Sequence, residues 1–208
     1  MKSILKPLMI ASIMLLLAGG QAVQSQGIQT LISGNVRHGG FGGPVVKFGS
    51  IDEELAVWVG GRGGWIIKID NAHSISLGGG GYGLVTDHLM PIQQNLSSNT
   101  ELASIGYGGI EVEYAHKPNQ VLHWSVSSLI GAGGITIRDK HYETFSTDEA
   151  SAFFAFEPGF HAVVNMTTYF RIGLGVSYLF TNGIEKGGLS DSDISGPKAQ
   201  ISLRFGSF

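Results

Sequence analysis

Phe170 to Phe180 read FRIGLGVSYLF, and this stretch decides the fold. Its even positions are apolar from end to end, whereas its odd positions include Arg171, Gly173, Gly175 and Ser177. Successive side chains of a β-strand point to opposite faces, so one face of this segment is apolar and the other carries its only charge. The pattern therefore predicts an amphipathic strand.

The same alternation recurs along the chain. Between Glu54 and Ile69 every charge falls on the even positions, and the odd positions carry Leu55, Val57, Val59, Trp65, Ile67 and Ile69. Segments at 110–114, 122–130, 154–164 and 201–205 repeat the pattern. Two segments are less regular: 73–86 contains four successive glycines, and 41–51 contains Pro44. A strand ladder tolerates proline at a strand start or a bulge, so we expect one of these at Pro44.

Eight strands account for these segments, at about 40–50, 54–68, 73–85, 101–115, 121–137, 151–164, 168–180 and 198–205. The connections at 70–72, 117–120 and 165–167 are tight, and those at 86–100, 138–150 and 181–197 are long. The connection at 51–53 is short although it belongs with the long ones. Alternating short turns and long loops are typical of outer-membrane barrels. The predicted fold is all-β: a closed antiparallel up-and-down transmembrane β-barrel of eight strands, with both termini at the periplasmic end.

The N-terminus has the pattern of a secretory signal peptide. Lys2 and Lys6 precede an apolar run at 8–18, and small residues follow at Gly20 and Ala22. The alternative is a membrane anchor, but the run is shorter than the ~20 residues that span a bilayer. We expect residues 1–22 to be the signal peptide, 23–39 an extended periplasmic lead-in, and 40–208 the barrel. A further strand within 23–39 stays open.

Composition excludes several classes of function. The net charge of -3 and the pI of about 6.1 provide no basic field for nucleic acid. The chain has no cysteine, and therefore no disulfides, lipoprotein attachment site or thiolate chemistry. Its 32 glycines have no collagen period and lie within strand patterns, as in a curved sheet.

Parity assigns the charges of the strands to the lumen. The predicted lumen network comprises Lys47, Glu54, Arg62, Lys68, Glu111, Glu113, Glu157, His161, Arg171 and Arg204. Its opposite charges nearly balance. Eight strands leave an interior just wide enough for side chains, and buried charges persist when they are paired. We therefore expect a salt-bridged plug rather than a wide aqueous pore.

The opposite parity predicts the lipid-facing surface. Its residues are Leu55, Val57, Trp65, Ile110, Val112, Trp124, Phe154, Phe156, Phe170, Ile172, Leu174, Val176, Leu203 and Phe205. Aromatic residues lie toward strand ends, where they mark membrane interfaces. The alternative is core packing in a soluble barrel, but soluble barrels have the inverse polarity, with charges outside.

Candidate chemical sites are weak. Asp148, Glu149, Asp191 and Asp193 carry oxygens suitable for a divalent cation but lack a calcium-loop spacing. His73, His88, His116 and His141 are scattered without the spacing of metal ligands. The runs GGFGGP, GGRGGW and GGGGYG lack the Lys-Ser/Thr pair of a phosphate loop. We expect no metal site and no cofactor.

His123 and Ser125 could form a base and nucleophile. Their His-x-Ser spacing resembles that of the outer-membrane lipid A 3-O-deacylase, itself an eight-stranded barrel. However, they follow the turn at Pro118, at the periplasmic end, whereas that enzyme works on lipid in the outer leaflet. The simpler interpretation is that both side chains face the lumen and have their hydrogen bonds satisfied there. We therefore expect no catalytic residue.

The signal peptide, the eight amphipathic segments and the terminal ISLRFGSF make the mature chain resemble small outer-membrane barrels of the OmpA/OmpX type. The stretch GGFGGPVVKF...VGGRGGWII...GGGGYGL also resembles a group of uncharacterised bacterial barrel proteins. Phe208 resembles the C-terminal aromatic assembly signal of such proteins. It departs from their pattern because the alternating apolar set of Ile201, Leu203 and Phe205 is offset by one residue.

The resemblance implies an integral protein of the bacterial outer membrane. It implies outer-membrane lipids and lipopolysaccharide as partners, and the barrel assembly machinery during biogenesis. Because this fold has structural, adhesive and enzymatic members, no single function transfers. We expect a non-enzymatic role in envelope structure or surface interaction. The alternatives are a lipid A-modifying enzyme, a narrow porin-like pore or small-ligand carrier, and a soluble lipocalin-like barrel.

Overall fold

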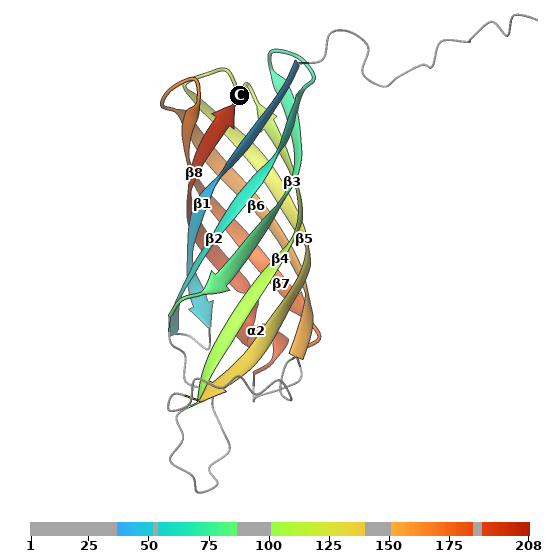
Figure 1. Ribbon diagram of the computed structural model, residues 1–208, viewed down its shortest axis with the longest axis vertical. Coiled ribbons are helices and arrows are strands. Elements are labelled where there is room, and N and C mark those ends of the chain that lie inside the picture. The colour runs from blue at the N-terminus through green and yellow to red at the C-terminus, as the bar shows by residue number, and fades with distance from the viewer. Residues whose placement is uncertain (1–36, 52–53, 87–100, 140–150, 185–188) are drawn as a thin grey trace, which may run out of the picture. The chain divides into compact units, whose positions relative to one another are not determined.

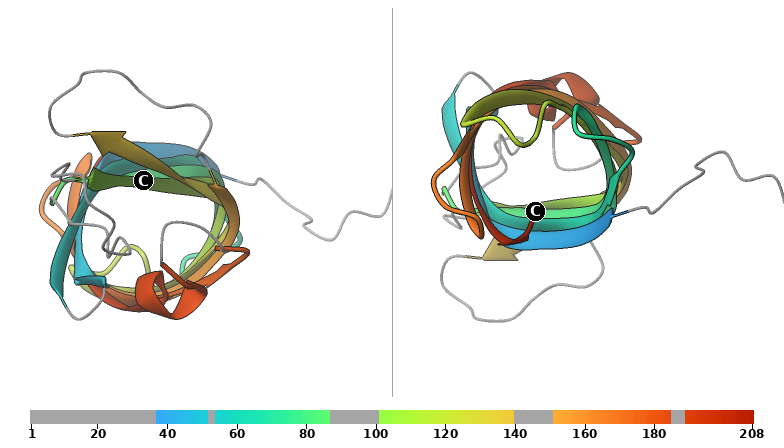
Figure 2. Two further views of the ribbon diagram at one scale, coloured as in Figure 1. Left: turned by 90° about the horizontal axis from the view of Figure 1, so that it is seen from below. Right: turned by 90° about the horizontal axis from the view of Figure 1, so that it is seen from above.

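The computed structural model describes residues 37–51, 54–86, 101–139, 151–184 and 189–208. Eight strands form a closed antiparallel barrel in which each strand pairs with the next and β8 pairs back with β1 (Figures 1 and 2). The strands are β1 (Arg37–Ile51), β2 (Glu54–Lys68), β3 (His73–Leu84), β4 (Glu101–His116), β5 (Leu122–Asp139), β6 (Ser151–Asn165), β7 (Phe170–Asn182) and β8 (Gly196–Ser207). The predicted fold class and strand number are confirmed.

The two ends of the barrel differ. At the end that we name the turn end, residues 69–72, 117–121 and 166–169 join consecutive strands, and β8 leads to the C-terminus (Figure 1). At the opposite end, which we name the loop end, lies the single described helical turn, α2 (Asp191–Ile194). The start of β1 pairs with the end of β2, so β1 begins at the turn end, as β8 finishes there.

Hydrogen bonds between the turns order the turn end. The carboxylate of Asp70 accepts the N–H groups of Ala72 and His73, at 2.6 and 2.7 Å. The Asn165 amide donates to the carbonyls of Pro118 and Gln120, at 2.9 and 2.6 Å. The Asp70 contacts order the turn at 69–72 internally, whereas Asn165 links the end of β6 to the turn at 117–121. The Asn119 amide donates to the Asn71 carbonyl at 3.3 Å and links that turn to 69–72.

Strand bounds depart from prediction at few places. β1 begins at Arg37, so residues 37–39 of the predicted lead-in belong to the barrel. β7 begins at Phe170 because residues 166–169 form the turn before it. The predicted signal peptide at 1–22 and the rest of the lead-in lie outside the described residues, and both stay predictions.

The expectation of a strand start or bulge at Pro44 is wrong. Pro44 lies in mid-β1 opposite Gly61 of β2. On the other side of β1, Gly42 pairs with Phe205 and Val45 pairs with Ser202, so the register with β8 is the same before and after the gap. Proline has no backbone N–H group, so β1 loses ladder hydrogen bonds to β8 at this position. No extra residue is inserted, and the strand therefore has no bulge.

Glycines allow strand backbones to approach where side chains would not fit. A Cβ atom on Gly78 of β3 would lie 1.9 Å from the carbonyl oxygen of Gly63 on β2. A Cβ atom on Gly131 of β5 would lie 2.0 Å from the carbonyl oxygen of Gly108 on β4. These positions explain part of the high glycine content, since any other residue would push the paired strands apart.

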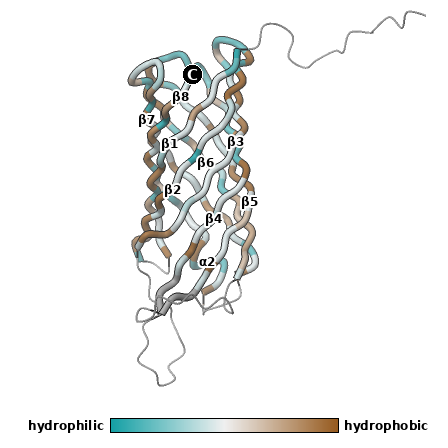
Figure 3. The backbone as a smooth tube through the Cα atoms, in the orientation of Figure 1, coloured by the Kyte–Doolittle hydropathy of each residue, from teal (hydrophilic) through white to brown (hydrophobic). Residues whose placement is uncertain are grey.

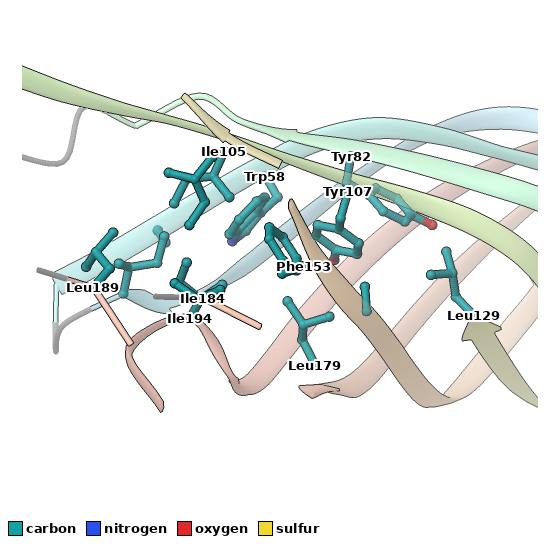
Figure 4. Packing of buried hydrophobic residues seen from close by; sticks show 14 of the residues in the cluster. Trp58, Tyr82, Ile105, Tyr107, Leu129, Phe153, Leu179, Ile184, Leu189 and Ile194 are labelled. Atoms are coloured by element: carbon teal, nitrogen blue, oxygen red, sulfur yellow. The ribbon is translucent and has the colours of Figure 1, made fainter. Parts of the chain in front are cut away.

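The loop-end half of the interior is an apolar core. Trp58, Phe153 and Leu179 are buried there with residues from the segment around α2, including Ile184, Leu189 and Ile194 (Figure 4). Trp58 packs edge-on against Tyr107, with ring centroids 5.4 Å apart. Hydrophilic residues instead gather at the turn end (Figure 3). Parity predicts an inward face but does not predict that half of it is apolar.

Candidate functional site

The outer face of the barrel is apolar. Every predicted lipid-facing residue lies on it, and none is buried. The exposed ones are Leu55, Trp65, Ile110, Val112, Trp124, Phe154, Leu174, Val176 and Phe205, and the half-buried ones are Val57, Phe156, Phe170, Ile172 and Leu203. Leu55 and Ile110 are 67% and 65% exposed. A soluble protein rarely leaves so continuous an apolar surface in water.

Aromatic rings gather on the outer face toward the turn end. Tyr114 and His116 lie beside Trp124, with ring centroids 5.9 and 5.2 Å away, and Trp124 stacks on Phe160 at 6.2 Å. His73 is 2.6 Å from the Tyr114 hydroxyl. Such amphipathic rings combine an apolar body with a polar tip, as at a boundary between water and hydrocarbon.

A second aromatic group lies on the outer face of β6 and β7. Phe180 stacks on Phe156 with ring centroids 5.9 Å apart and contacts Tyr178 at 4.5 Å. These rings lie nearer the loop end than the turn end, because Phe180 is near the end of β7. The outer face therefore has aromatic residues toward both of its edges.

Inside the barrel, four charged side chains from three strands form a central ion cluster. Arg62 of β2 pairs with Glu111 of β4 at 2.6 Å and also with Glu113. Arg204 of β8 pairs with Glu113 at 2.6 Å. All four are buried. Because β2, β4 and β8 are not neighbours in the sheet, this central ion cluster connects separate parts of the barrel wall across the lumen.

A second buried cluster surrounds Glu157 of β6. The Lys47 amine lies 2.7 Å from the Glu157 carboxylate, which also accepts hydrogen bonds from Tyr107 at 2.8 Å and Ser177 at 2.6 Å. The same amine lies 3.4 Å from the centre of the Tyr82 ring. Each charged group in this Glu157 cluster thus has several partners, as buried charges require.

The predicted lumen residues do not all join these two clusters. Glu54 is exposed at the start of β2, and Lys68 is half-buried at its end. Arg171 donates to the Pro118 carbonyl at 3.2 Å and lies 3.8 Å from the centre of the Phe208 ring. His161 is buried and contacts Ser127 at 2.8 Å. Residues at strand ends share the inward parity, but they lie at the mouths of the barrel.

The predicted near balance of opposite charges in the lumen is wrong, because buried cations outnumber buried carboxylates. Among the described residues, five cationic side chains are buried (Lys47, Arg62, Arg171, Lys198 and Arg204) against three carboxylates (Glu111, Glu113 and Glu157). The two excess cations lie against aromatic rings instead of carboxylates: Arg171 faces Phe208, and the Lys198 amine lies 4.6 Å from the centre of the Trp58 ring. Aromatic faces attract cations when water is excluded.

Sequence reasoning missed four lumen residues that a stricter use of parity would have included. Trp58 shares the parity of Arg62, and Tyr107 shares that of Glu111. Lys198 shares the parity of Arg204 in β8. The signal for Tyr82 is weaker, because the glycines of β3 obscure which parity is apolar.

Phe208 has its side chain on the inward side, over the turn end of the lumen. Its ring faces Arg171 and stacks on the inward-facing Phe41, with ring centroids 6.4 Å apart. The offset seen in the sequence therefore has a structural counterpart: Phe205 is exposed on the outer face and stacks on Phe170, whereas Phe208 is not part of that row. Its role as an assembly signal stays a prediction.

His123 and Ser125 are both buried in the lumen, but they form no base–nucleophile pair, and the interpretation that both have their hydrogen bonds satisfied is wrong for Ser125. Ser125 is fully buried and its Oγ has no hydrogen-bond partner in the described part of the chain. His123 contacts the Gln120 carbonyl at 3.3 Å instead. The imidazole next to a hydroxyl is His161, whose other nitrogen faces the Gln200 amide at 3.4 Å rather than a carboxylate.

Acidic loop residues in the described segments bind backbone groups. Asp191 accepts the N–H groups of Gly183 and Ile184, at 3.2 and 3.1 Å, and Asp193 accepts that of Ser190 at 2.7 Å. Asp148, Glu149, His88 and His141 lie outside the described residues. Within the described ranges, no cluster of three or more His, Asp or Glu side chains could hold a metal ion. The same ranges contain no helix that is long and apolar enough to cross a membrane.

Comparison with solved structures identifies barrels of similar architecture. Ail, the attachment invasion locus protein of Yersinia pestis, solved in complex with the heparin analogue sucrose octasulfate, has a TM-score of 0.53 at 9% identity. The match covers 81% of this chain and 97% of Ail. The fold is that of the small eight-stranded outer-membrane β-barrels.

Two further barrels match with lower TM-scores. Neisserial surface protein A gives 0.44 at 10% identity, covering 84% of this chain and 99% of that protein. The N-terminal β-barrel domain of Pseudomonas aeruginosa OprF gives 0.44 at 12% identity, covering 81% and 96%. No family model and no curated protein matches the sequence. At these identities the likeness concerns the fold alone.

Proposed function

We propose that this chain is an integral protein of the bacterial outer membrane with a non-enzymatic role in envelope structure or surface interaction. A cleaved signal peptide at 1–22 precedes the barrel. Both termini face the periplasm, and the loop end faces the medium. Its partners are outer-membrane lipids and lipopolysaccharide, with the barrel assembly machinery engaged during biogenesis.

The observation that carries the proposal is the inverted polarity of the wall. Large apolar side chains such as Leu55, Ile110 and Val176 are more than half exposed, whereas Arg62, Glu113 and Glu157 are buried. In water each exposed apolar side chain would forgo about 1.5–3 kcal/mol of hydrophobic stabilisation. A hydrocarbon surrounding removes that penalty, and closure of the sheet satisfies its backbone hydrogen bonds without water.

The filled interior supports a structural rather than a conducting role. The central ion cluster and the Glu157 cluster occupy the middle of the lumen, and the apolar core with Ile194 occupies the loop-end half. A water-filled channel of porin type requires about 16 strands. We therefore expect no large, stable single-channel currents in planar bilayers, and such currents would contradict a filled lumen.

The test of location is envelope fractionation followed by gel electrophoresis of boiled and unboiled samples. A closed barrel in the outer membrane stays with the membrane on carbonate washing and runs at an altered mobility until it is boiled. Recovery in the soluble fraction, with equal mobility before and after boiling, would contradict the proposal and favour a soluble barrel.

The non-enzymatic role has its own test, the mass spectrum of lipid A from a deletion strain. The described residues contain no hydrogen-bonded Ser-His-carboxylate arrangement, so we expect the spectrum to match that of the parent strain. An additional acyl group in the deletion strain, removed when the wild-type gene is restored but not when a Ser125→Ala or Ser127→Ala variant is, would establish a lipid A deacylase instead.

A further inference from the structure

We propose that the outer face of the barrel carries a binding site for one acyl chain of a membrane lipid, in a groove around Pro158 of β6. The inference rests on the proposed membrane location. The groove has a volume of about 530 Å³ and crosses β5, β6, β7 and the start of β8. Outward-facing Val126, Phe160, Val176 and Tyr178 form its apolar walls.

Pro158 produces the groove. Its small ring lies among larger outward side chains: Phe160, two residues further along β6, and Val176 and Tyr178 of the neighbouring β7. Proline also lacks the N–H group that the β6–β7 ladder needs. Phe156 pairs with Phe180 and Gly159 pairs with Ser177, while the two pairs between them are missing from the ladder. The wall is therefore low and loosely bonded around Pro158.

The floor of the groove is thin but chemically inert. Gly159 faces inward without a side chain, and a Cβ atom there would lie 3.2 Å from the Ser127 hydroxyl. Ser127 and Ser177 line both the groove and a small internal cavity of about 10 Å³. Their hydroxyls contact His161 and Glu157 on the inner side, at 2.8 and 2.6 Å. Both hydroxyls are thus bonded to the lumen network.

The lining selects an apolar, uncharged occupant. No charged side chain lines the groove, which continues into the exposed apolar face, where Val176 is 60% and Phe160 48% exposed. A methylene chain lying in the groove contacts walls on two sides and gains more dispersion energy than one on a flat strand. The rings of Tyr178 and Phe180 contact each other at the loop-end side, where an amphipathic ring suits the ester group of the chain. The occupant is therefore a lipid chain that enters from the loop end.

The test uses the full chain in vesicles of phosphatidylethanolamine and phosphatidylglycerol that contain a phosphatidylethanolamine with a photoreactive diazirine in mid-chain. Cross-linked peptides are then mapped by mass spectrometry. We expect a several-fold excess of cross-links at Val126, Phe160 and Val176 over Leu77 and Ile110, which are comparably exposed elsewhere on the barrel. A uniform distribution would overturn the site.

A matched pair of variants tests the same claim. Val176→Trp fills the groove and should remove the excess of cross-links, whereas Leu174→Trp, two residues away on the same outer face and 56% exposed, should retain it. Equal cross-linking in both variants would overturn the assignment of the groove. Release of free fatty acid by the wild type, lost in Ser127→Ala, would replace a binding site with an ester hydrolase.

Failure of the groove and failure of the membrane location give different results. If the location is wrong, the protein neither inserts into vesicles nor changes mobility on boiling. If only the groove is wrong, the protein inserts and changes mobility, but the cross-links are spread evenly over the outer face.

Discussion

Removing the shared carboxylate of the central ion cluster should destabilise the barrel strongly. Glu113 pairs with Arg62 and Arg204, and Glu113 is the only carboxylate within ion-pair distance of Arg204 in the described residues. Glu113→Gln preserves the volume but leaves Arg62 with Glu111 alone and Arg204 with no carboxylate partner among the described residues. Leaving one partner of a buried pair without its counter-charge costs about 3–5 kcal/mol.

The assay is equilibrium unfolding in urea, in detergent micelles or vesicles, followed by tryptophan fluorescence. For a urea dependence of about 1–3 kcal/mol per molar, this loss lowers the unfolding midpoint by roughly 1–5 M. Thr168→Ala is the control, because Thr168 is exposed in the turn before β7. A surface substitution of this kind changes stability by about 0.5 kcal/mol or less.

A double variant separates charge from packing. Glu113→Met with Arg204→Met removes one charge of each sign and leaves Arg62 paired with Glu111. Replacing a buried ion pair by apolar side chains is often neutral or stabilising, so the double variant should recover most of the loss. The reasoning is refuted if Glu113→Gln unfolds at the midpoint of Thr168→Ala, or if the double variant is less stable than the single one.

Three other predictions concern the wall and the two ends of the lumen. Gly78→Ala should reduce the yield of heat-modifiable barrel on gels, because its Cβ would lie 1.9 Å from a backbone oxygen of β2, whereas Gly83→Ala, with nothing within 4 Å, should not. Trp58→Ala should lower the unfolding free energy by about 3–5 kcal/mol, and the exposed Trp65→Ala by much less; equal losses would contradict an apolar core in the loop-end half. Phe208→Ala should cost about 0.5–2 kcal/mol in the same urea assay through the lost ring contact with a buried cation, and an unchanged midpoint would show that the contact contributes nothing.

The fold could be predicted largely from parity and loop length. The segment 170–180 alternates almost perfectly, and β7 occupies Phe170–Asn182. Parity is local and follows from the pleat of a strand, so it survives even where propensity is weak. The prediction at Pro44 failed because a closed sheet with many ladder bonds can lose some on one side of a strand without a change of register.

The interior was less predictable. Parity placed Arg62 and Glu113 inside, but which charges meet depends on the stagger between strands that are distant in the sequence. It also treated Glu54 like Glu113, since it does not report how near a residue lies to the mouth of the barrel. The groove at Pro158 depends on the sizes of side chains on four strands, which no single segment of sequence records.

Closure of the barrel joins the two ends of the strand sequence. Gly40 lies opposite Ser207 and Phe48 lies opposite Ala199, so the last seam of the wall is made from the first and the final strands of the chain. A nascent or truncated polypeptide that lacks β8 keeps two unpaired sheet edges, each ready to associate with another chain. The molecule is therefore protected from such association only after its whole length has been synthesised.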